Sequence, residues 1–486
     1  TTAARRGPGG GQCGRAAHWP ARAQFAIEPP HLQLIAQGTP HDPSFRKNRW
    51  LALPCLVAAG LLAWYVTREP ASPFADAQAT AADPALVSRG EYVARLSDCV
   101  ACHSLPDGKP FAGGLEMATP LGAIHATNIT PDRDSGIGNY TLADFDRAVR
   151  QGVAPGGRRL YPAMPYPSYA KLSDDDVKAL YAFFMHGVQP ARQANLASDI
   201  PWPLNLRWPI ALWNGLFAAT TPYTAKAGQD AQWNRGAYIV QGPGHCGSCH
   251  TPRGLAFNEK ALDDSGKPFL SGALLDGWYA PSLRADHNTG LGRWSEAEIA
   301  QFLKTGRNRH AVVYGSMTEA FNNSTQFMRD DDLAAIAHYL KSLPGDPQRD
   351  GAPWQYQAES LATRLDSPGA RTYVTRCGSC HGLDGKGQAE WMPPLAGATS
   401  ALAKESASAI NITLNGSQRV VAAGVPDAYR MPALREQLSD QEIADVLSFV
   451  RTAWGNQGGA VDAQAVGKLR GHTDPASSSP IILHMR

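Results

Sequence analysis

Cys99-Val100-Ala101-Cys102-His103, Cys246-Gly247-Ser248-Cys249-His250 and Cys377-Gly378-Ser379-Cys380-His381 are three copies of one pattern, Cys-x-x-Cys-His. From the composition of this 486-residue chain, with 8 cysteines and 14 histidines, about 0.004 copies are expected by chance. Two thiols followed by a histidine are the attachment pattern of c-type haem, in which both thiols bond to the porphyrin edge and the histidine binds the iron. The sequence therefore predicts three covalently bound haem c groups.

Two other kinds of site also use closely spaced cysteines. A zinc site needs a second Cys or His pair nearby to complete its tetrahedron, whereas each motif here lies roughly 130 residues or more from the next. A thioredoxin-like redox pair explains neither the repetition nor the histidine after every second cysteine. Haem attachment accounts for all three copies.

A short segment of helical character, with a glycine near an aromatic residue, precedes each motif. The glycines are Gly90, Gly236 and Gly369, and a glycine at such a place lets a second helix cross closely. The expected partners are the helices that end each repeat, which begin with acidic residues and continue with apolar residues at 3–4 spacing: 172–186, 329–341 and 438–451. We predict a mainly α fold of three tandem class I cytochrome c-like domains with long loops, preceded by one N-terminal apolar helix.

The repeats also predict the domain boundaries. Segment 136–152 matches segment 290–306 at a constant offset of 154, and this match aligns the first two repeats. The expected parts are a disordered or non-native extension (1–45), a signal peptide or membrane anchor (46–66), domain 1 (83–190), a Trp/Pro-rich connector (191–228), domain 2 (229–346), domain 3 (360–455) and a flexible tail (456–486). The connector is interpreted either as a strap over the first two domains or as a docking surface for another subunit or a bilayer.

Charge patterning bears on location and partners. The basic cluster Arg46-Lys47-Asn48-Arg49 precedes a run of uncharged, mostly apolar residues from Trp50 to Val66. A positive flank stays on the cytoplasmic side, so we expect the domains after Val66 on the opposite, extracytoplasmic side of the membrane. Beyond the basic N-terminal stretch the chain is slightly acidic, which argues against nucleic acid as a partner.

The second axial ligand of each iron is expected to be a methionine in a loop between the repeated helices. Met164, Met317 and Met431 recur at similar positions after the expected proximal ligands. Methionine is also a common gap-filling core residue, but this repetition favours ligands. The expected ligand pairs are His103 with Met164, His250 with Met317, and His381 with Met431.

Other residues compete for these roles. Met117 and Met392 follow their motif histidines closely, and Met185 and Met328 lie on or beside expected helices, where packing is the usual role. His310 could replace Met317, so the second ligand pair stays open at this point. Four further histidines are interpreted as surface or packing residues: His125, His186, His287 and His338.

The sequence holds no motif for a second chemistry. It has no dinucleotide-binding glycine fingerprint, no P-loop and no His-Glu-x-x-His. With both axial positions of each iron filled, substrate would find no open site, which favours an electron relay over a catalyst. Two alternatives remain: a free-standing or oxidase-associated multi-haem carrier, and a multi-haem peroxidase, which would need one iron with a displaceable ligand.

Several phrases outside the motifs carry a family resemblance. They are Thr127-Asn-Ile-Thr-Pro-Asp132, Gly136-Ile-Gly138, Leu160-Tyr-Pro-Ala-Met-Pro-Tyr166, Thr325-Gln-Phe-Met-Arg-Asp-Asp-Asp332 and Trp454-Gly-Asn456. From about Arg89 to Asn456 the chain resembles the three-haem cytochrome c subunit of bacterial membrane-bound dehydrogenases. These subunits serve quinoprotein, flavoprotein and some molybdenum enzymes.

The resemblance implies a set of site residues and a role. It makes Cys99, Cys102, Cys246, Cys249, Cys377 and Cys380 the haem attachment residues, His103, His250 and His381 the proximal ligands, and Met164, Met317 and Met431 the ligands opposite. It also implies that the chain passes electrons from a dehydrogenase catalytic subunit to ubiquinone or a terminal oxidase at the membrane. On this reading the chain is a subunit of an oxidoreductase complex and does not itself oxidise the substrate.

Overall fold

The structure is a computed structural model, and it describes residues 44–77, 83–219, 221–358 and 365–477, together with 483 and 485. The chain divides into two compact units, Thr1–Gly60 and Leu61–Arg486. All but the last two residues of the predicted extension 1–45 lie outside the described residues. Helix α1 (Ser44–Thr67) contains the predicted apolar segment 46–66. In the part of the chain that the structure describes, no helix has the length and apolarity needed to span a bilayer.

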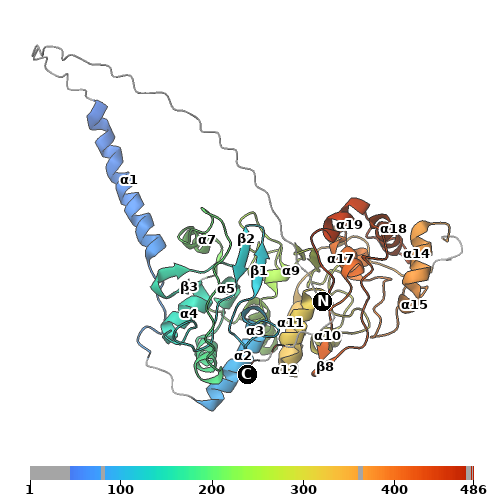
Figure 1. The fold of residues 1–486 in the computed structure, drawn as a ribbon, viewed down its shortest axis with the longest axis horizontal. Coiled ribbons are helices and arrows are strands. Elements are labelled where there is room, and N and C mark those ends of the chain that lie inside the picture. The colour runs from blue at the N-terminus through green and yellow to red at the C-terminus, as the bar shows by residue number, and fades with distance from the viewer. Residues whose placement is uncertain are drawn as a thin grey trace, which may run out of the picture. The chain divides into compact units, whose positions relative to one another are not determined.

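The second unit is mainly helical, and its elements follow one another in three similar runs (Figure 1). The first run comprises α2 (Pro84–Leu96), α3 (Cys99–His103), β1 (Glu116–Thr119), β2 (Gly122–His125), α4 (Leu142–Gln151), β3 (Val153–Ala154), η1 (Pro155–Gly157), β4 (Arg158–Arg159), α5 (Tyr166–Tyr169), α6 (Asp174–Ala182) and η2 (Phe183–Gly187). Helix α7 (Pro209–Phe217) lies in the connector.

The second run comprises α8 (Ala231–Gln241), α9 (Gly247–His250), β5 (Ala273–Leu275), β6 (Trp278–Ala280), α10 (Glu296–Thr305), α11 (Met317–Asn323), η3 (Thr325–Phe327), α12 (Asp330–Ser342) and α13 (Pro347–Asp350). The third comprises α14 (Pro368–Arg376), α15 (Gly378–His381), α16 (Thr399–Leu402), α17 (Ala407–Asn415), β7 (Val421–Ala422), β8 (Val425–Pro426), α18 (Asp440–Val450) and α19 (Ala463–Arg470). The named strands form only two-stranded antiparallel hairpins.

Each run contains one tightly crossed helix pair: α2 with α6, α8 with α12, and α14 with α18. A glycine lies at every crossing. A Cβ atom added to Gly90 would lie 1.9 Å from the carbonyl oxygen of Ala179, and one added to Gly236 would lie 2.0 Å from that of Ala335. At Gly369 the corresponding distance to the Asp445 oxygen is 2.1 Å. The predicted close crossing of these helices is confirmed.

Local sequence explains where several of these helices begin. Helices α4, α10 and α18 start with a complete capping box, in which a Ser or Thr and an acid three residues later bond to each other's backbone N–H. Ser295 with Glu298 forms this box in α10, and Ser439 with Glu442 forms it in α18. The boxes satisfy N–H groups that a helix start otherwise leaves without partners.

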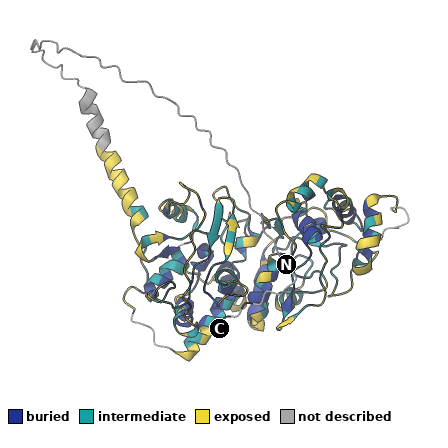
Figure 2. Cartoon of the chain, in the orientation of Figure 1, coloured by how far each residue is buried: buried dark blue, intermediate teal, exposed yellow. Residues whose placement is uncertain are grey.

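The hydrophobic core is divided unequally among the three helix pairs. The first two pairs share one continuous core, to which Leu180, Ile239 and Leu340 all belong. The third pair has a separate core, in which Tyr373 and Trp454 are fully buried. Figure 2 colours the chain by burial and shows buried stretches on helices of each part of the compact unit. The first two pairs are therefore packed as one body, and the third is joined to them by other contacts.

Two buried carboxylates connect the first two helix pairs in a reciprocal way. Asp176 of α6 accepts a hydrogen bond from Arg89 of its own pair, at 2.8 Å, and one from Tyr238 of the second pair. Asp332 of α12 accepts from Arg235 of its own pair and from Tyr92 of the first, each at 2.6 Å. Each acid thus binds an arginine from its own pair and a tyrosine from the other, and Asp332 binds Arg329 as well, at 3.3 Å.

The reciprocal bonds also fix the ionisation of the groups that form them. Burial, together with Asp332, raises the pKa of Tyr92 to about 12. Burial alone would raise the pKa of Asp332, but the hydrogen bonds from Arg235 and Tyr92 lower it below its usual value. The tyrosine therefore stays protonated and donates to a carboxylate that stays ionised at neutral pH.

The predicted flexible tail, 456–486, is only partly unstructured among the residues that the structure describes. Helix α19 lies within it and packs on α17 and α18. Val466 of α19 is fully buried, and Arg470 forms an ion pair with Asp440 at 2.7 Å. The Gly/Ala/Ser-rich composition suggested a mobile segment, but one apolar face with Val466 at its centre is enough to dock a helix.

Gly236→Ala should destabilise the compact unit. The new methyl group would overlap the Ala335 carbonyl, so α8 and α12 must move apart, at a cost of about 2 kcal/mol or more. Thermal unfolding monitored by circular dichroism measures the change. Gly471→Ala is the matched control, because its added methyl group would meet only ordinary contacts beyond 3.5 Å. Equal melting temperatures of the two variants would contradict the crossing.

Tyr92→Phe and Tyr238→Phe should each lower the free energy of unfolding by about 2 kcal/mol. Each change removes a hydrogen bond to a buried carboxylate, and such bonds to charged groups contribute about that much. Denaturant titration gives the values. Tyr429→Phe serves as the control, since that ring is 51% exposed. A change no larger than the control's would show that the bonds between the pairs add no stability.

Candidate haem attachment sites

Each Cys-x-x-Cys-His motif forms a short helical turn directly after the first helix of its pair. The turns are α3, α9 and α15, which follow α2, α8 and α14. All six motif cysteines are free thiols. Burial raises the pKa of the first cysteine in every motif, to about 12 for Cys246 and about 11 for Cys377. The crossed helices therefore place a pair of cysteines at the same position in each run.

The three motif histidines are oriented by the same hydrogen bond. The Nδ1 atom of His103 lies 2.7 Å from the Thr127 carbonyl oxygen, and that of His250 lies 2.7 Å from the Pro281 oxygen. The Nδ1 of His381 lies 3.0 Å from the Pro393 oxygen.

A carbonyl oxygen can only accept a hydrogen bond, so Nδ1 carries the proton in all three rings. The lone pair is then on Nε2, as an iron ligand requires. Burial lowers the pKa of each imidazole and keeps it neutral. The histidines thus fit the role of proximal haem ligands, and the thiols beside them fit the role of attachment residues.

The three methionines are partly buried and lie beyond the repeated middle helices. Met164 lies in a tight turn, where its carbonyl accepts the Tyr166 N–H at 2.8 Å. Met431 is held from both sides by Ser417, whose hydroxyl accepts the Met431 N–H and whose N–H bonds to the Met431 carbonyl, each at 3.0 Å. Both occupy the expected loops.

The prediction of a loop is wrong for Met317, which is the first residue of helix α11. The left-handed Gly315 turns the chain, and the Thr318 N–H then bonds to its carbonyl at 2.9 Å. Glu319 in the first turn stabilises the start of this helix. Met317 nonetheless borders a small core made by Val313, Phe321 and Val420.

His310, the alternative to Met317, is engaged elsewhere. Its ring is stacked on Trp294, with centroids 5.1 Å apart and planes 12° apart. Its Nε2 lies 3.4 Å from a carboxylate oxygen of Glu298. The ring therefore packs on Trp294, just before α10, and its Nε2 lies near Glu298 without a hydrogen bond. The stacking and the nearby carboxylate favour Met317 as the ligand.

The other competing residues have structural roles. Met328 is buried in the shared core and Met185 packs against it, as the sequence suggested. His338 lies between Asp230 and Glu296, at 3.3 and 3.1 Å. Met117 lies in β1, and Met392 forms a β-bridge with Gln388. His125 lies in β2, and His186 is exposed in η2. His287 is half-buried, and its sequence neighbours Asp286 and Asn288 are buried.

Sequence reasoning missed a residue between the first two sites. His245, directly before the second motif, packs its ring edge-to-face on Tyr169, with centroids 5.7 Å apart. The Tyr169 hydroxyl donates to the Ser97 carbonyl, just before the first motif, at 2.7 Å. Burial lowers the pKa of His245, although the Ser97 backbone acts in the opposite direction. The one sequence signal is position: Asp98 and His245 both precede a first cysteine, and both have positive φ.

Further contacts bring the first two attachment sites together. Burial first, and then the charges of Asp98, Glu319 and Cys249, raise the pKa of the Cys102 thiol to about 12. Cys249 belongs to the second motif, so the two thiols lie within electrostatic range. Helix α11, which starts at Met317, also packs on α3 of the first motif. Sites one and two therefore form an adjacent pair.

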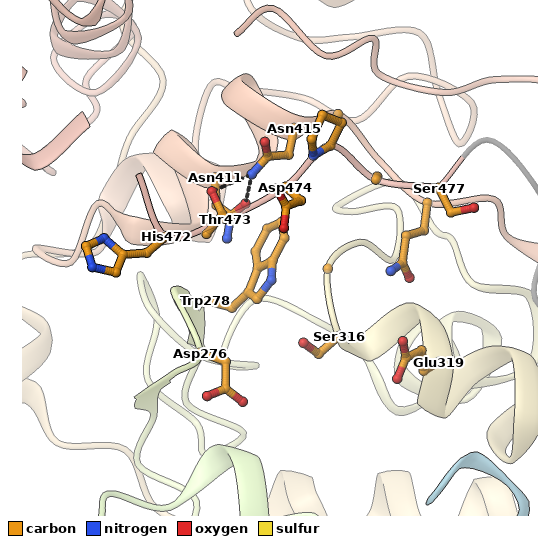
Figure 3. A pocket seen from close by; sticks show the side chains of 15 residues that line it. Asp276, Trp278, Ser316, Glu319, Asn411, Asn415, His472, Thr473, Asp474 and Ser477 are labelled. Atoms are coloured by element: carbon orange, nitrogen blue, oxygen red, sulfur yellow. Dashed lines mark hydrogen bonds between the residues drawn. The ribbon is translucent and has the colours of Figure 1, made fainter. Parts of the chain in front are cut away.

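The third site is joined to the second through a polar junction. The Ser408 hydroxyl of α17 accepts the Tyr279 N–H at 2.8 Å and donates to the Tyr279 carbonyl at 3.0 Å. A pocket of about 300 Å³ lies at this junction. Figure 3 shows side chains from β6, α11 and α17 around it, together with residues of the tail that follows α19. Ser316 beside Met317 and Gly416 beside the Met431 carbonyl both line it.

Comparison with known proteins gives a consistent set of relatives. A family model described as cytochrome c matches residues 234–344 and 367–454. The cytochrome c subunit of alcohol dehydrogenase (quinone) from Komagataeibacter europaeus is 50% identical over 413 residues, which cover 83% of this chain and 88% of the relative.

Two further relatives are subunits of the same kind. The cytochrome c subunit of gluconate 2-dehydrogenase from Pantoea cypripedii is 49% identical over 406 residues, covering 80% of this chain and 90% of the relative. The fructose dehydrogenase cytochrome subunit from Gluconobacter japonicus is 36% identical over 434 residues, which cover 83% of this chain and 86% of the relative.

Met317→His should keep the second iron low-spin but lower its reduction potential, because a thioether favours reduced iron more than imidazole does. His310→Ala should leave all potentials unchanged, since that ring packs on Trp294 and lies near Glu298. Redox titration of the haem-loaded protein, followed by visible absorption, compares the two variants. If only His310→Ala shifts a potential, His310 is the ligand.

Proposed function

This chain belongs to the family of cytochrome c subunits of bacterial dehydrogenases, and from that premise we propose that it relays electrons through three covalently bound haems. The observation that carries the proposal is the same short geometry at three places: a Cys-x-x-Cys-His turn with the histidine Nδ1 on a backbone carbonyl. Each turn offers two thiols for attachment and a neutral Nε2 for iron. The family model covers two of the three places.

Each haem, when bound, supplies an iron that takes up and releases one electron. The chain's own residues set how readily this occurs. The backbone carbonyls fix the tautomer and the ring plane of the proximal histidines. Met164, Met317 and Met431 are proposed as the opposite ligands, and a thioether in that position raises the potential. With these side chains on both sides of each iron, a substrate would find no free position, and we therefore propose a relay rather than a catalyst.

The unequal division of the core suggests how the three haems are grouped. Sites one and two share a core and are linked by the His245–Tyr169–Ser97 contacts, so haems bound there would lie near each other. The third site has its own core and is reached through the Ser408–Tyr279 junction. We place the fast electron exchange within the pair.

The electron donor is proposed to be the catalytic subunit of a dehydrogenase. Three relatives are named as subunits of alcohol, gluconate and fructose dehydrogenases, which supports a dehydrogenase as the partner. The resemblance found in the sequence suggests that this subunit is of the quinoprotein, flavoprotein or molybdenum type. The proposed acceptor is ubiquinone or a terminal oxidase. The proposed location is the periplasmic side of the cytoplasmic membrane, in keeping with the basic cluster before the apolar segment.

Pyridine haemochrome analysis of the purified protein should give about three haems per chain, and haem staining should persist after denaturing electrophoresis. Cys377→Ala combined with Cys380→Ala should reduce the count to about two, because the other attachment sites lie in a separate core. Cys55→Ala, outside the motifs, is the control and should leave three. A count of two haems in the unmodified protein would mean that one of the three predicted attachment sites binds no haem.

A further inference from the structure

The connector and the end of α1 expose an unusual number of large apolar side chains. Among those of the connector, Trp202 is 77% exposed, Leu216 75% and Trp208 47%. At the end of α1, Leu61 is 61% exposed and Trp64 60%. We call these five residues the apolar patch. Exposed groups of this size usually mark a contact surface.

The two segments that carry the apolar patch lie against each other. The Tyr65 hydroxyl of α1 donates to the Ala211 carbonyl of α7 at 3.4 Å, and a Cβ added to Gly215 would lie 2.3 Å from that hydroxyl. Two arginines tie the same region together: Arg207 donates to the Arg159 carbonyl at 3.3 Å, and Arg159 donates to the Arg68 carbonyl at 2.9 Å. The end of α1 and helix α7, which carry most of the patch, are therefore neighbours.

The face of helix α7 that is turned away from the apolar patch packs over the loop that contains Met164. Asn214 accepts a hydrogen bond from Tyr166 at 2.6 Å and donates to the Gln151 carbonyl at 3.2 Å. Trp213 donates to the Ala256 carbonyl at 2.8 Å, and Ala211 is buried. The strap interpretation of the connector therefore describes this face, and the outward face has no partner among the described residues.

Positive charge accompanies the apolar patch. Arg68 and Arg158 are exposed, and Arg207 is half-buried. Among the described residues none of these three forms an ion pair within 4 Å, whereas nearby Glu69 is engaged by Arg147 at 3.7 Å. Arg68 lies over the rings of Trp64 and Tyr65, 4.9 Å from each centroid. Arg68 therefore stands beside Trp64, Arg207 lies over the Tyr161 ring, and neither they nor Arg158 have an acidic partner among the described residues.

We propose that this surface docks on a bilayer of anionic phospholipid, with the tryptophans and leucines at the level of the headgroups and the arginines on the lipid phosphates. Tryptophan favours that depth because one end of the indole is apolar and the other donates a hydrogen bond. Unpaired arginines beside it attract the negative surface of the membrane. The inference rests on the membrane location proposed above and is independent of the haem count.

The docking also bears on the first haem site. The strap face of α7 binds Tyr166, two residues after Met164, and the patch face binds lipid. Binding to the bilayer thus covers the loop that carries the proposed ligand. The first site would stand closest to the membrane, where an acceptor such as ubiquinone is found.

Hydrogen–deuterium exchange of the full-length, haem-loaded protein tests the docking. Vesicles of phosphatidylglycerol and phosphatidylethanolamine should slow exchange in segments 61–68 and 202–217 severalfold. Vesicles of phosphatidylcholine alone should slow it less. Because the readout is local, binding by the rest of α1 does not mask it. Unchanged exchange in 202–217 with anionic vesicles would overturn the proposal.

Two pairs of substitutions separate the apolar from the ionic contribution. Trp202→Ser with Leu216→Ser should abolish the protection, and Arg68→Gln with Arg158→Gln should remove its dependence on anionic lipid. Leu255→Ser with Val425→Ser is the matched control, since both side chains are exposed outside the apolar patch. Unaltered Soret spectra and three haems in every variant show that the fold and the proposed relay are intact.

The same measurement detects a protein partner. If 202–217 is protected by the co-purified dehydrogenase subunit in detergent but not by vesicles, the surface is a subunit contact and the lipid proposal is wrong.

Discussion

The close crossing of two helices over a glycine is the constraint on which each haem site depends. In every run the first helix of the pair leads directly into the Cys-x-x-Cys-His turn, so the crossing fixes where the thiols begin. A side chain larger than hydrogen at Gly90, Gly236 or Gly369 would collide with a backbone carbonyl that cannot move without breaking its own helix. Backbone packing thus determines the place of the chemistry.

The reciprocal carboxylates add a second level of order to the first two runs. A buried ion pair is weak evidence for stability, since taking charges out of water costs about as much as their attraction returns. Its clearest effect is specificity of fit. Asp176 and Asp332 are each satisfied only when the tyrosine of the other helix pair is in place, so a rotated or shifted arrangement would leave a buried charge short of a partner. This fit holds sites one and two in a fixed relation.

The sequence was sufficient for features that depend on local pattern. The motifs, the crossing glycines and the acid-started helices all follow from spacing within about 15 residues, and the structure has the crossings and the helices. The sequence did not reveal contacts between distant segments, such as Tyr92 with Asp332 or His245 with Tyr169. Met317 was expected in a loop because, like Met164 and Met431, it lies between the repeated helices, yet it begins a helix of its own. Likewise, the composition of the tail hid the one apolar face that docks α19.

The histidine bonds show how different loops meet one requirement. The carbonyl acceptors come 24 residues after His103, 31 after His250 and only 12 after His381, from a threonine in one case and prolines in the others. The β-hairpins β1–β2 and β5–β6 account for the longer loops, and the third run lacks a hairpin there. Since any backbone carbonyl serves as acceptor, side-chain identity at that position is free to vary. What all three runs retain is a neutral imidazole with its Nδ1 occupied, because an iron ligand needs Nε2 unprotonated and held still.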